Sequence, residues 1–224
     1  MTRFAISDIH GCYYTFKELL NTIGLNKSDE LILLGDYINR GSYSKEVVDL
    51  VMQLETDQYN IHCIKGNHED MIFDSILYDD EASGEPETLK SFGISNLREI
   101  PKKYTDWFLN LKPYHISGNY ILVHAGLDFK QKHLLTDNRN MYWINFWYED
   151  IDYERLGDKI IIHGHKSVEK QDILSMRDDI LQSQVLAIDN GCFKTDQPGL
   201  GSLCCFNLDT KDLYFEPNRE LKNL

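Results

Sequence analysis

Potential metal ligands follow five short apolar runs in this chain, each at the point where the run stops. Carboxylate, imidazole and amide donors with no cysteine among them favour manganese, iron or zinc, and their number exceeds what one tetrahedral ion binds. Two divalent ions about 3.5–4 Å apart that share a carboxylate clamp the attacking and leaving oxygens of a phosphoryl displacement. The donors therefore predict hydrolysis of a phosphoester. They are Asp8 and His10, then Asp36, then Asn67 and His68, then His124, and last His163 and His165.

The apolar runs themselves predict the strands that position these donors. Each run is continuous rather than alternating, which is typical of a strand buried on both faces. Between the first three runs, segments 13–22 and 44–55 repeat apolar residues at three- and four-residue spacing and predict helices. This β-α-β-α-β order predicts an α/β sheet whose ligands converge at the carboxyl ends of its strands. The runs cover residues 4–6, 31–34, 61–64, 120–123 and 159–162.

The rest of the chain divides into a helical part and a closing β part. The stretch from about 70 to 118 has no strong strand pattern, and its apolar residues suit helices. Near the end, short apolar runs at 185–188, 203–206 and 213–215 predict closing strands, with a hairpin turn between the last two at 209–212. A length of 224 residues suits a single catalytic domain over the whole chain.

Composition narrows the classes of partner. The chain holds 36 acidic against 23 basic residues, a formal charge of −13. An acidic balance argues against a nucleic-acid polymer as partner, because such binding draws on Lys and Arg, but metal ions can reverse the local field and admit a small phosphorylated substrate. The sequence has neither an apolar leader nor a run of about 20 apolar residues, which predicts a soluble, cytoplasmic protein that does not enter a membrane. The five scattered cysteines predict buried, reduced thiols.

Five motifs occur in order along the chain. They are Asp8-Ile9-His10-Gly11, Gly35-Asp36-Tyr37-Ile38-Asn39-Arg40-Gly41, Gly66-Asn67-His68-Glu69, His124-Ala125-Gly126 and His163-Gly164-His165. Together they resemble the phosphoprotein phosphatase branch of the calcineurin-like metallophosphoesterases, which includes lambda-type protein phosphatases and symmetrical dinucleoside tetraphosphatases. The resemblance extends over nearly the whole chain. It implies an α/β fold in which two mixed β-sheets flanked by helices form an α/β/β/α sandwich.

The resemblance also implies which residues hold metal. Two divalent ions are expected, with manganese the first choice and iron or zinc as alternatives. They would lower the pKa of a bound water enough to supply hydroxide near neutral pH. Asp8 and His10 would hold the first ion, Asp36 would bridge the two, and Asn67, His124 and His165 would hold the second.

Substrate contacts follow from the same matching. His68 would be the general acid that protonates the leaving oxygen. Arg40 offers a planar fork of donors for the phosphoryl oxygens. Asn67 and Asn145 would add further substrate contacts, and Glu69 is expected to support the loop without a direct role.

Two positions depart from the family pattern. Asn39 stands where the family usually has an Asp that pairs with the general acid. An amide oxygen can accept the imidazole N–H but cannot stabilise the imidazolium by charge, so His68 should be a weaker base and the acid limb of the rate profile should shift to lower pH. Asn145 stands where related bacterial sequences often have a phosphate-clamping Arg. Arg139, Arg155 or Lys166 could replace that charge, with Lys166 the first candidate because it follows His165, and a surface-facing lysine is the alternative for Lys166.

The remaining conspicuous side chains are predicted to be structural. Aromatic clusters more often pack against helices than stack on bases, and a histidine outside a ligand cluster is more often structural or at the surface. The first group is Tyr142, Trp143, Phe146, Trp147 and Tyr148, and the second is His62, His115 and His133.

These patterns predict a metal-dependent phosphoesterase in which hydroxide activated by two metals attacks and a histidine acts as acid. The short 70–118 segment suggests an open cleft, which favours phosphomonoesters on a serine/threonine phosphoprotein, with phosphotyrosine as a further target. A symmetrical dinucleoside tetraphosphate hydrolase is the first alternative, since the two classes share every metal ligand. A phosphate-binding regulatory protein with weak catalysis is the second, motivated by Asn39 and Asn145.

Overall fold

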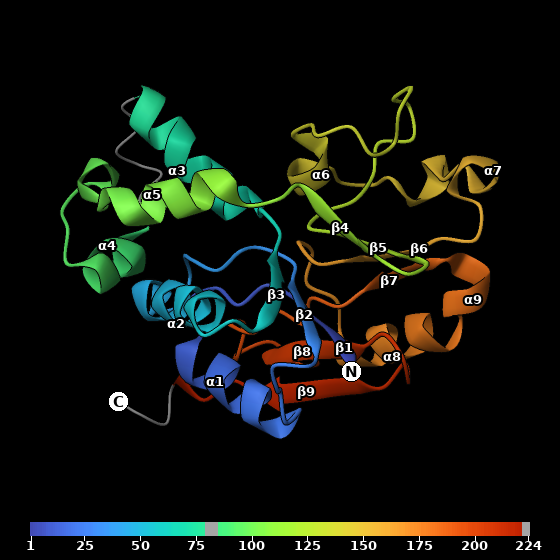
Figure 1. The fold of residues 1–224 in the computed structure, drawn as a ribbon, viewed down its shortest axis with the longest axis horizontal. Helices are drawn as coiled ribbons and strands as arrows, with labels where there is room; N and C mark the ends of the chain where they lie inside the picture. Colours follow the sequence, from blue (N-terminus) through green and yellow to red (C-terminus); the bar gives the residue numbers. More distant parts are fainter. Residues whose placement is uncertain (79–84, 221–224) are drawn as a thin grey trace.

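Two mixed β-sheets pack face to face in the computed structural model, which describes residues 1–78 and 85–220 (Figure 1). The first sheet has the order β3-β2-β1-β8-β9. In it, β1 to β3 are parallel, β8 is antiparallel to β1, and β9 is antiparallel to β8. The second has the order β4-β5-β6-β7, with only β4 antiparallel. The strands are β1 (Arg3–Ile6), β2 (Glu30–Leu33), β3 (Asn60–Cys63), β4 (Tyr114–Ser117), β5 (Tyr120–Val123), β6 (Ile160–His163), β7 (Val185–Ala187), β8 (Ser202–Asn207) and β9 (Leu213–Pro217).

Helices cover the outer faces of both sheets, which completes the α/β/β/α sandwich predicted from the sequence. Figure 1 shows α3, α4 and α5 grouped on one side of the molecule, away from α8 and α9. The helices are α1 (Tyr13–Thr22), α2 (Ser44–Thr56), α3 (Asn67–Tyr78), α4 (Pro86–Phe92), α5 (Lys102–Asn110), α6 (Asn140–Trp143), α7 (Tyr153–Leu156), α8 (Lys170–Asp178) and α9 (Ile180–Ser183), with 3-10 turns η2 (Leu97–Glu99) and η3 (Tyr148–Asp150).

Burial on both faces explains why continuous apolar runs predicted these strands. Side chains from both sheets fill a shared apolar layer, among them Ile32, Leu122, Ile162 and Phe206, each fully buried. The opposite faces of the two sheets are covered by separate apolar clusters, so β2, β5 and β6 are buried along their whole length. A strand buried on both faces requires a continuous apolar run. The predicted hairpin is also confirmed, because β8 and β9 pair directly across the 209–212 turn.

One prediction for the 70–118 segment is wrong. The described part of that segment is mostly helical, as expected, while residues 79–84 lie outside the description. The exception is β4, a strand that pairs antiparallel with β5 at the edge of the second sheet. Its four residues are half-buried or exposed except for Ser117, so it has no apolar run to signal a strand. Pairing with its neighbour, rather than local pattern, makes this segment a strand.

The short helices near the second sheet were not predicted either. Helix α8 buries Ile173 alone among its nine residues, which leaves almost no amphipathic pattern to detect. The cysteine prediction is confirmed, since all five side chains are buried and free. Across residues 1–78 and 85–220, every helix is too short or too polar to cross a lipid bilayer.

A polar cluster joins the two sheets at the start of β2. The Glu30 carboxylate accepts a hydrogen bond of 2.5 Å from the Ser117 hydroxyl and one of 3.1 Å from the His115 ring. The His62 Nε2 lies 3.3 Å from the same carboxylate, and the two imidazoles are stacked with their centroids 3.8 Å apart. Among the described residues, Glu30, His62 and His115 thus form a group of donor atoms within 4.8 Å of one another, and His133 is exposed. That His62 and His115 are structural stays a prediction.

We expect this cluster to make stability fall on acidification. Burial works against ionisation of Glu30, but the bonds from Ser117 and His115 outweigh it and lower the pKa of Glu30 below its usual 4.5. Burial and the nearby His115 lower the pKa of His62. Both groups bind protons more weakly in the folded state, so their stabilisation is present near pH 7 and is lost as the pH falls through 6 and below.

Replacing Glu30 by Gln should therefore lower the free energy of unfolding by about 1 kcal/mol at pH 7 and flatten its decline below about pH 5, where Glu30 itself takes up a proton. Urea unfolding at pH 7 and at several pH values below 5 measures both effects. The exposed Glu154 provides a control, because E154Q should follow the wild-type curve. Equal slopes for E30Q and wild type would refute the assignment.

Candidate active site

Potential ligands from both sheets meet at one place, where the parallel strands end. One group of donor atoms within 4.8 Å of one another comes from His10, Asp36 and His68, and a second comes from Asp8, Asp36 and His124. Asp36 belongs to both groups. It follows β2 in the first sheet, whereas His124 follows β5 in the second, so the sandwich itself assembles the cluster.

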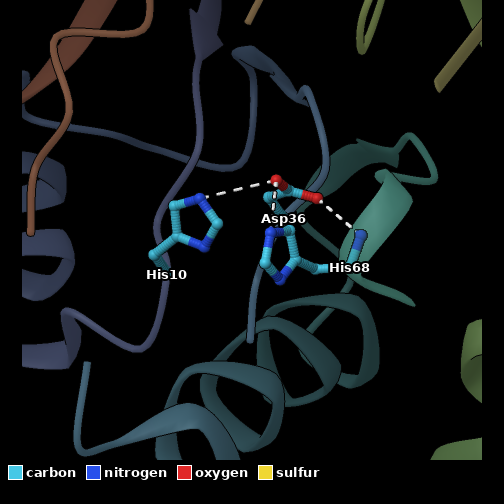
Figure 2. A group of neighbouring side chains, drawn as sticks. All are labelled: His10, Asp36 and His68. Carbon is cyan, nitrogen blue, oxygen red and sulfur yellow. Dashed lines mark hydrogen bonds and ion pairs between the residues drawn. The ribbon is translucent and has the colours of Figure 1, made fainter. Parts of the chain in front are cut away.

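The first half of the cluster is built on Asp36. Figure 2 shows the rings of His10 and His68 beside its carboxylate. The His10 Nε2 lies 3.4 Å from Asp36 Oδ2 and the His68 Nε2 lies 3.9 Å from it, while the His68 backbone N–H donates to Asp36 Oδ1 at 3.0 Å. The carboxylate is thus oriented by backbone on one side, and its other oxygen faces two imidazoles.

The second half brings together Asn67, His124 and His165. The Asn67 Oδ1 lies 3.0 Å from both His124 Nε2 and His165 Nδ1, and those two nitrogens are 3.2 Å apart. The His124 Nε2 also lies 3.5 Å from Asp36 Oδ1. Donors bound to one ion at about 2.1 Å lie close to 3–3.5 Å from one another. This donor set could therefore hold a cation.

The cluster buries two carboxylates, those of Asp8 and Asp36, without a positive charge to balance them in the described part of the chain. The Asp8 Oδ2 is buried and has no hydrogen-bond partner within the described part of the chain. Burial raises the pKa of Asp8 well above its usual value, and nearby Asp189 adds to the effect. Burial and the neighbouring Asp8 do the same to the pKa of Asp36. Two ionised carboxylates this deeply buried need nearby positive charge to balance them. Bound divalent cations would provide that charge.

The histidines are prepared as neutral ligands. Burial lowers the pKa of His10 to about 4 and that of His124 well below its usual value. The Nδ1–H of His10 donates to the Ile38 carbonyl at 3.0 Å, and that of His124 donates to the Leu34 carbonyl at 2.9 Å. These bonds leave each Nε2 lone pair directed at the carboxylates, because a hydrogen bond at one ring nitrogen fixes the orientation of the other, as it does for histidines that bind metal ions. The residues present fit a pair of divalent cations.

Backbone geometry explains why glycine occurs beside the ligands. A Cβ on Gly66 would overlap Asp36 Oδ1, and one on Gly164 would overlap Asp8 Oδ2. Several non-glycine residues here have positive φ, including His10 at 48°, Asp36 at 52° and His165 at 70°. Such conformations cost about 1–3 kcal/mol each and persist where surrounding contacts impose them.

Glu69 provides one of those imposing contacts. Its side chain is fully buried, and its carboxylate accepts backbone N–H bonds from Asp36 at 3.0 Å, Tyr37 at 2.8 Å and Gly66 at 3.0 Å. Each of these bonds comes from the backbone rather than from a ligand side chain. The prediction that Glu69 supports the loop agrees with this geometry.

Glu69→Ala should destabilise the fold strongly, because it leaves the N–H groups of Asp36, Tyr37 and Gly66, and the more distant one of Ile38 at 3.4 Å, without this acceptor. At about 1–3 kcal/mol per unsatisfied group, we expect a loss of at least 3 kcal/mol in the free energy of unfolding, measured by urea denaturation. Glu69→Gln keeps one acceptor oxygen and should fall in between. The control E87A removes a carboxylate that, within residues 1–78 and 85–220, accepts from the Ser42 hydroxyl and from no backbone N–H. Similar midpoints for E69A and E87A would contradict the assigned role.

Asn39 contacts His68 differently from the prediction. The Nδ2 of Asn39 lies 2.8 Å from His68 Nδ1, and the Asn39 Oδ1 accepts instead from the Thr88 hydroxyl at 2.7 Å. The amide therefore donates to the imidazole rather than accepting from it, because Thr88 occupies the oxygen. Burial first, then the charge of His10, lowers the pKa of His68 to about 2. His68 is held neutral, with its proton on the Nε2 that faces Asp36.

The other predicted substrate contacts lie around the rim. The Arg40 guanidinium is half-exposed and pairs with Glu85 at 2.9 Å. Asn145 is exposed and donates to the Trp143 carbonyl at 3.2 Å. His163 is buried and bonds to the Tyr148 hydroxyl at 2.5 Å, apart from the ligand groups.

Thr88 and Glu85 were missed at the sequence level. They lie more than 40 residues after Asn39 and Arg40, on and just before α4, and no motif connects the two segments.

An α/β/β/α sandwich with this donor cluster at its strand ends defines the class of two-metal phosphoester hydrolases. The family model described as calcineurin-like phosphoesterase matches residues 1–192. The chain belongs to that family.

Named relatives are found among both curated sequences and solved structures. The symmetrical bis(5'-nucleosyl)-tetraphosphatase of Nitrosospira multiformis is 34% identical over 130 residues, which are 57% of this chain and 44% of that protein. This chain therefore spans less than half of that relative. A structure described as a candidate diadenosine tetraphosphatase superposes with a TM-score of 0.71 at 16% identity, covering 97% of this chain and 93% of the other. A serine/threonine phosphatase from Saccharomyces cerevisiae gives 0.65 at 17% identity, covering 96% and 79%.

Proposed function

We propose that this protein hydrolyses dinucleoside tetraphosphates symmetrically, which replaces our leading prediction of a protein phosphatase with its first alternative. The observation that carries the proposal is the 34% identity to a symmetrical bis(5'-nucleosyl)-tetraphosphatase over 57% of this chain. A second relative with that name, from Neisseria meningitidis, is also 34% identical over 131 residues. The protein phosphatase match rests on fold alone, at 17% identity.

In the proposed reaction, water attacks one of the two central phosphorus atoms and the P–O bond to the central bridging oxygen breaks. Two nucleoside diphosphates result. Asp8, His10 and Asp36 would hold one divalent cation, and Asp36, Asn67, His124 and His165 the other. Bound cations of this kind polarise phosphoryl oxygens and lower the pKa of water. We propose Mn²⁺ as the resident ion, since the donors are oxygen and nitrogen.

The remaining roles belong to residues of the chain itself. The His68 Nε2–H faces the cluster and would donate to the departing oxygen, while the Asn39 Nδ2 holds the other ring nitrogen as an acceptor. Arg40 would bind phosphoryl oxygens with the part of its fork that Glu85 leaves free.

Asn39 supports an anhydride substrate on chemical grounds. A departing serine alkoxide is a strong base that must receive a proton, which a charged imidazolium supplies best. A departing nucleoside diphosphate is already a stable phosphate anion and needs far less acid. His68, held neutral between Asn39 and the cluster, is a weak acid and suits the second case.

A substrate panel tests the proposal. With Mn²⁺, kcat/KM for diadenosine tetraphosphate should exceed that for a phosphoserine peptide by about 100-fold, as expected where one leaving group depends on general-acid catalysis. Chromatography should show ADP as the nucleotide product. Production of AMP and ATP would contradict symmetrical cleavage, and preference for the peptide would restore the protein phosphatase prediction. Turnover no higher than that of His68→Asn on every substrate would instead indicate the phosphate-binding protein.

A further inference from the structure

A cavity of about 610 Å³ opens beside the candidate metal cluster. Its wall comes from two segments, residues 144–149 and 163–168, with Ala125 and Ala187 at the base. His165 lines this cavity and also faces Asn67 and His124 in the cluster, so the two sites are continuous. Most of the lining is apolar, and the volume falls in the range of about 300–1,000 Å³ that small-molecule sites occupy. We call it the Phe146 pocket.

Phe146 is the unusual residue of this wall. Its side chain is 90% exposed, and its backbone φ of 56° lies in the left-handed region. A large apolar ring gains nothing from water, and a non-glycine residue pays in strain for that conformation. The packing predicted for the aromatic cluster is therefore confirmed for the buried Tyr142 and Trp147 and wrong for Phe146.

The adjacent Trp147 explains how Phe146 is held outward. Its side chain is 3% exposed, and its Nε1–H donates to the Ala125 carbonyl at 3.0 Å. The indole lies against Gly126, where any Cβ would overlap it. Trp147 thus fixes the loop at residues 144–149, and this holds the Phe146 ring in the lining of the pocket.

Lys166 places a positive charge beside the Phe146 ring. The Lys166 Nζ lies 3.8 Å from the centroid of Phe146, and Lys166 directly follows the candidate ligand His165. Asn145 adds a side-chain amide to the lining, and Glu149 is the other charged residue there. A ligand with a flat ring for Phe146 and a phosphate for Lys166 matches these groups, because bases stack on aromatic side chains and Lys attracts phosphate.

We propose that the Phe146 pocket binds one nucleoside of the dinucleoside polyphosphate, with the base on Phe146 and the adjoining phosphates running past Lys166 to the metal cluster. This proposal rests on the function proposed above, and it names Phe146 as a determinant of substrate specificity. Lys166 thereby contacts the polyphosphate chain near the base.

Binding measurements separate the pocket from the metal cluster. ADP and inorganic pyrophosphate share a diphosphate, and ADP adds the nucleoside that the pocket would bind. In calorimetric titrations of the Mn²⁺-loaded protein, we expect ADP to bind about tenfold more tightly than pyrophosphate, the gain typical of one stacked base. Phe146→Ala should remove that difference by weakening ADP alone, and Phe146→Trp should restore it.

Controls keep the outcomes distinct. Leu181 on α9 is another exposed apolar residue, 71% exposed and outside the pocket, so L181A should behave as wild type. Equal affinity for ADP and pyrophosphate in the wild type would overturn the pocket, as would F146A weakening both ligands alike. If diadenosine tetraphosphate is not cleaved but the Phe146-dependent preference for ADP persists, the proposed function falls and the pocket stands. If it is cleaved and F146A binds ADP normally, the pocket alone falls.

Discussion

Replacing Asp36 by Asn should remove at least one of the two metal ions and most of the catalytic activity. Asp36 is the one described residue that contributes to both donor groups, with Oδ2 3.4 Å from His10 and Oδ1 3.5 Å from His124. An Asn has a single oxygen and no charge, so it cannot bridge two cations. We expect metal content to fall from two ions per chain to one or fewer, and kcat/KM to fall by roughly 10³-fold, since metal ions contribute several kcal/mol of transition-state stabilisation.

Metal analysis after gel filtration and steady-state kinetics measure the two effects. Asp29 offers a matched control, because it is also a buried carboxylate but lies at the opposite end of β2, where it accepts from the Thr2 backbone at 2.8 Å. D29N should retain two ions and wild-type turnover even if it unfolds at lower temperature. Retention of both ions by D36N would show that Asp36 does not bridge.

Replacing Asn39 by Asp should change which leaving groups the enzyme tolerates. A carboxylate 2.8 Å from His68 Nδ1 would accept a hydrogen bond from the Nδ1–H of the imidazolium. This contact stabilises the charged form and raises the pKa of His68. We expect kcat/KM for a phosphoserine peptide to rise at least tenfold, within the range that general-acid catalysis contributes. Turnover of diadenosine tetraphosphate should change by less than about twofold, because its leaving group needs little protonation.

The pH profile supplies an independent readout. A raised pKa means that N39D loses protonated His68 as the pH rises through that value, so the variant should gain an alkaline limb that the wild type lacks. This differs from the shifted acid limb predicted from the sequence, because the structure has the amide donating rather than accepting. N39A removes donor and acceptor together and serves as the control. Superimposable profiles for N39D and wild type would refute the role of Asn39.

Much of the site could be read from the sequence because its information is local. Each donor directly follows a short apolar run, as His124 follows β5 and Asp36 follows β2. A strand buried between layers needs such a run, and a parallel strand ends where ligands collect. The order of the motifs then defined the family, which the match over residues 1–192 establishes.

The features that the sequence did not predict depend on contacts between segments far apart in the chain. Strand β4 is a strand because β5 pairs with it, although its own residues lack an apolar pattern. The amide of Asn39 is turned by Thr88, which lies 49 residues further along the chain. Arg40 is paired with Glu85, 45 residues away. Pairings between distant segments depend on how the layers pack, which residue spacing does not encode.

The sequence by itself thus determined the strands, and it predicted the candidate donor set at their ends and the two-metal chemistry that those donors suit. Only the tertiary structure decided which atom of Asn39 faces His68, how Glu69 fixes the ligand loop and that Phe146 stands exposed beside His165. Donor identity follows from side-chain chemistry along the chain. Orientation and exposure follow from hydrogen bonds and packing between segments that only the folded sandwich brings together.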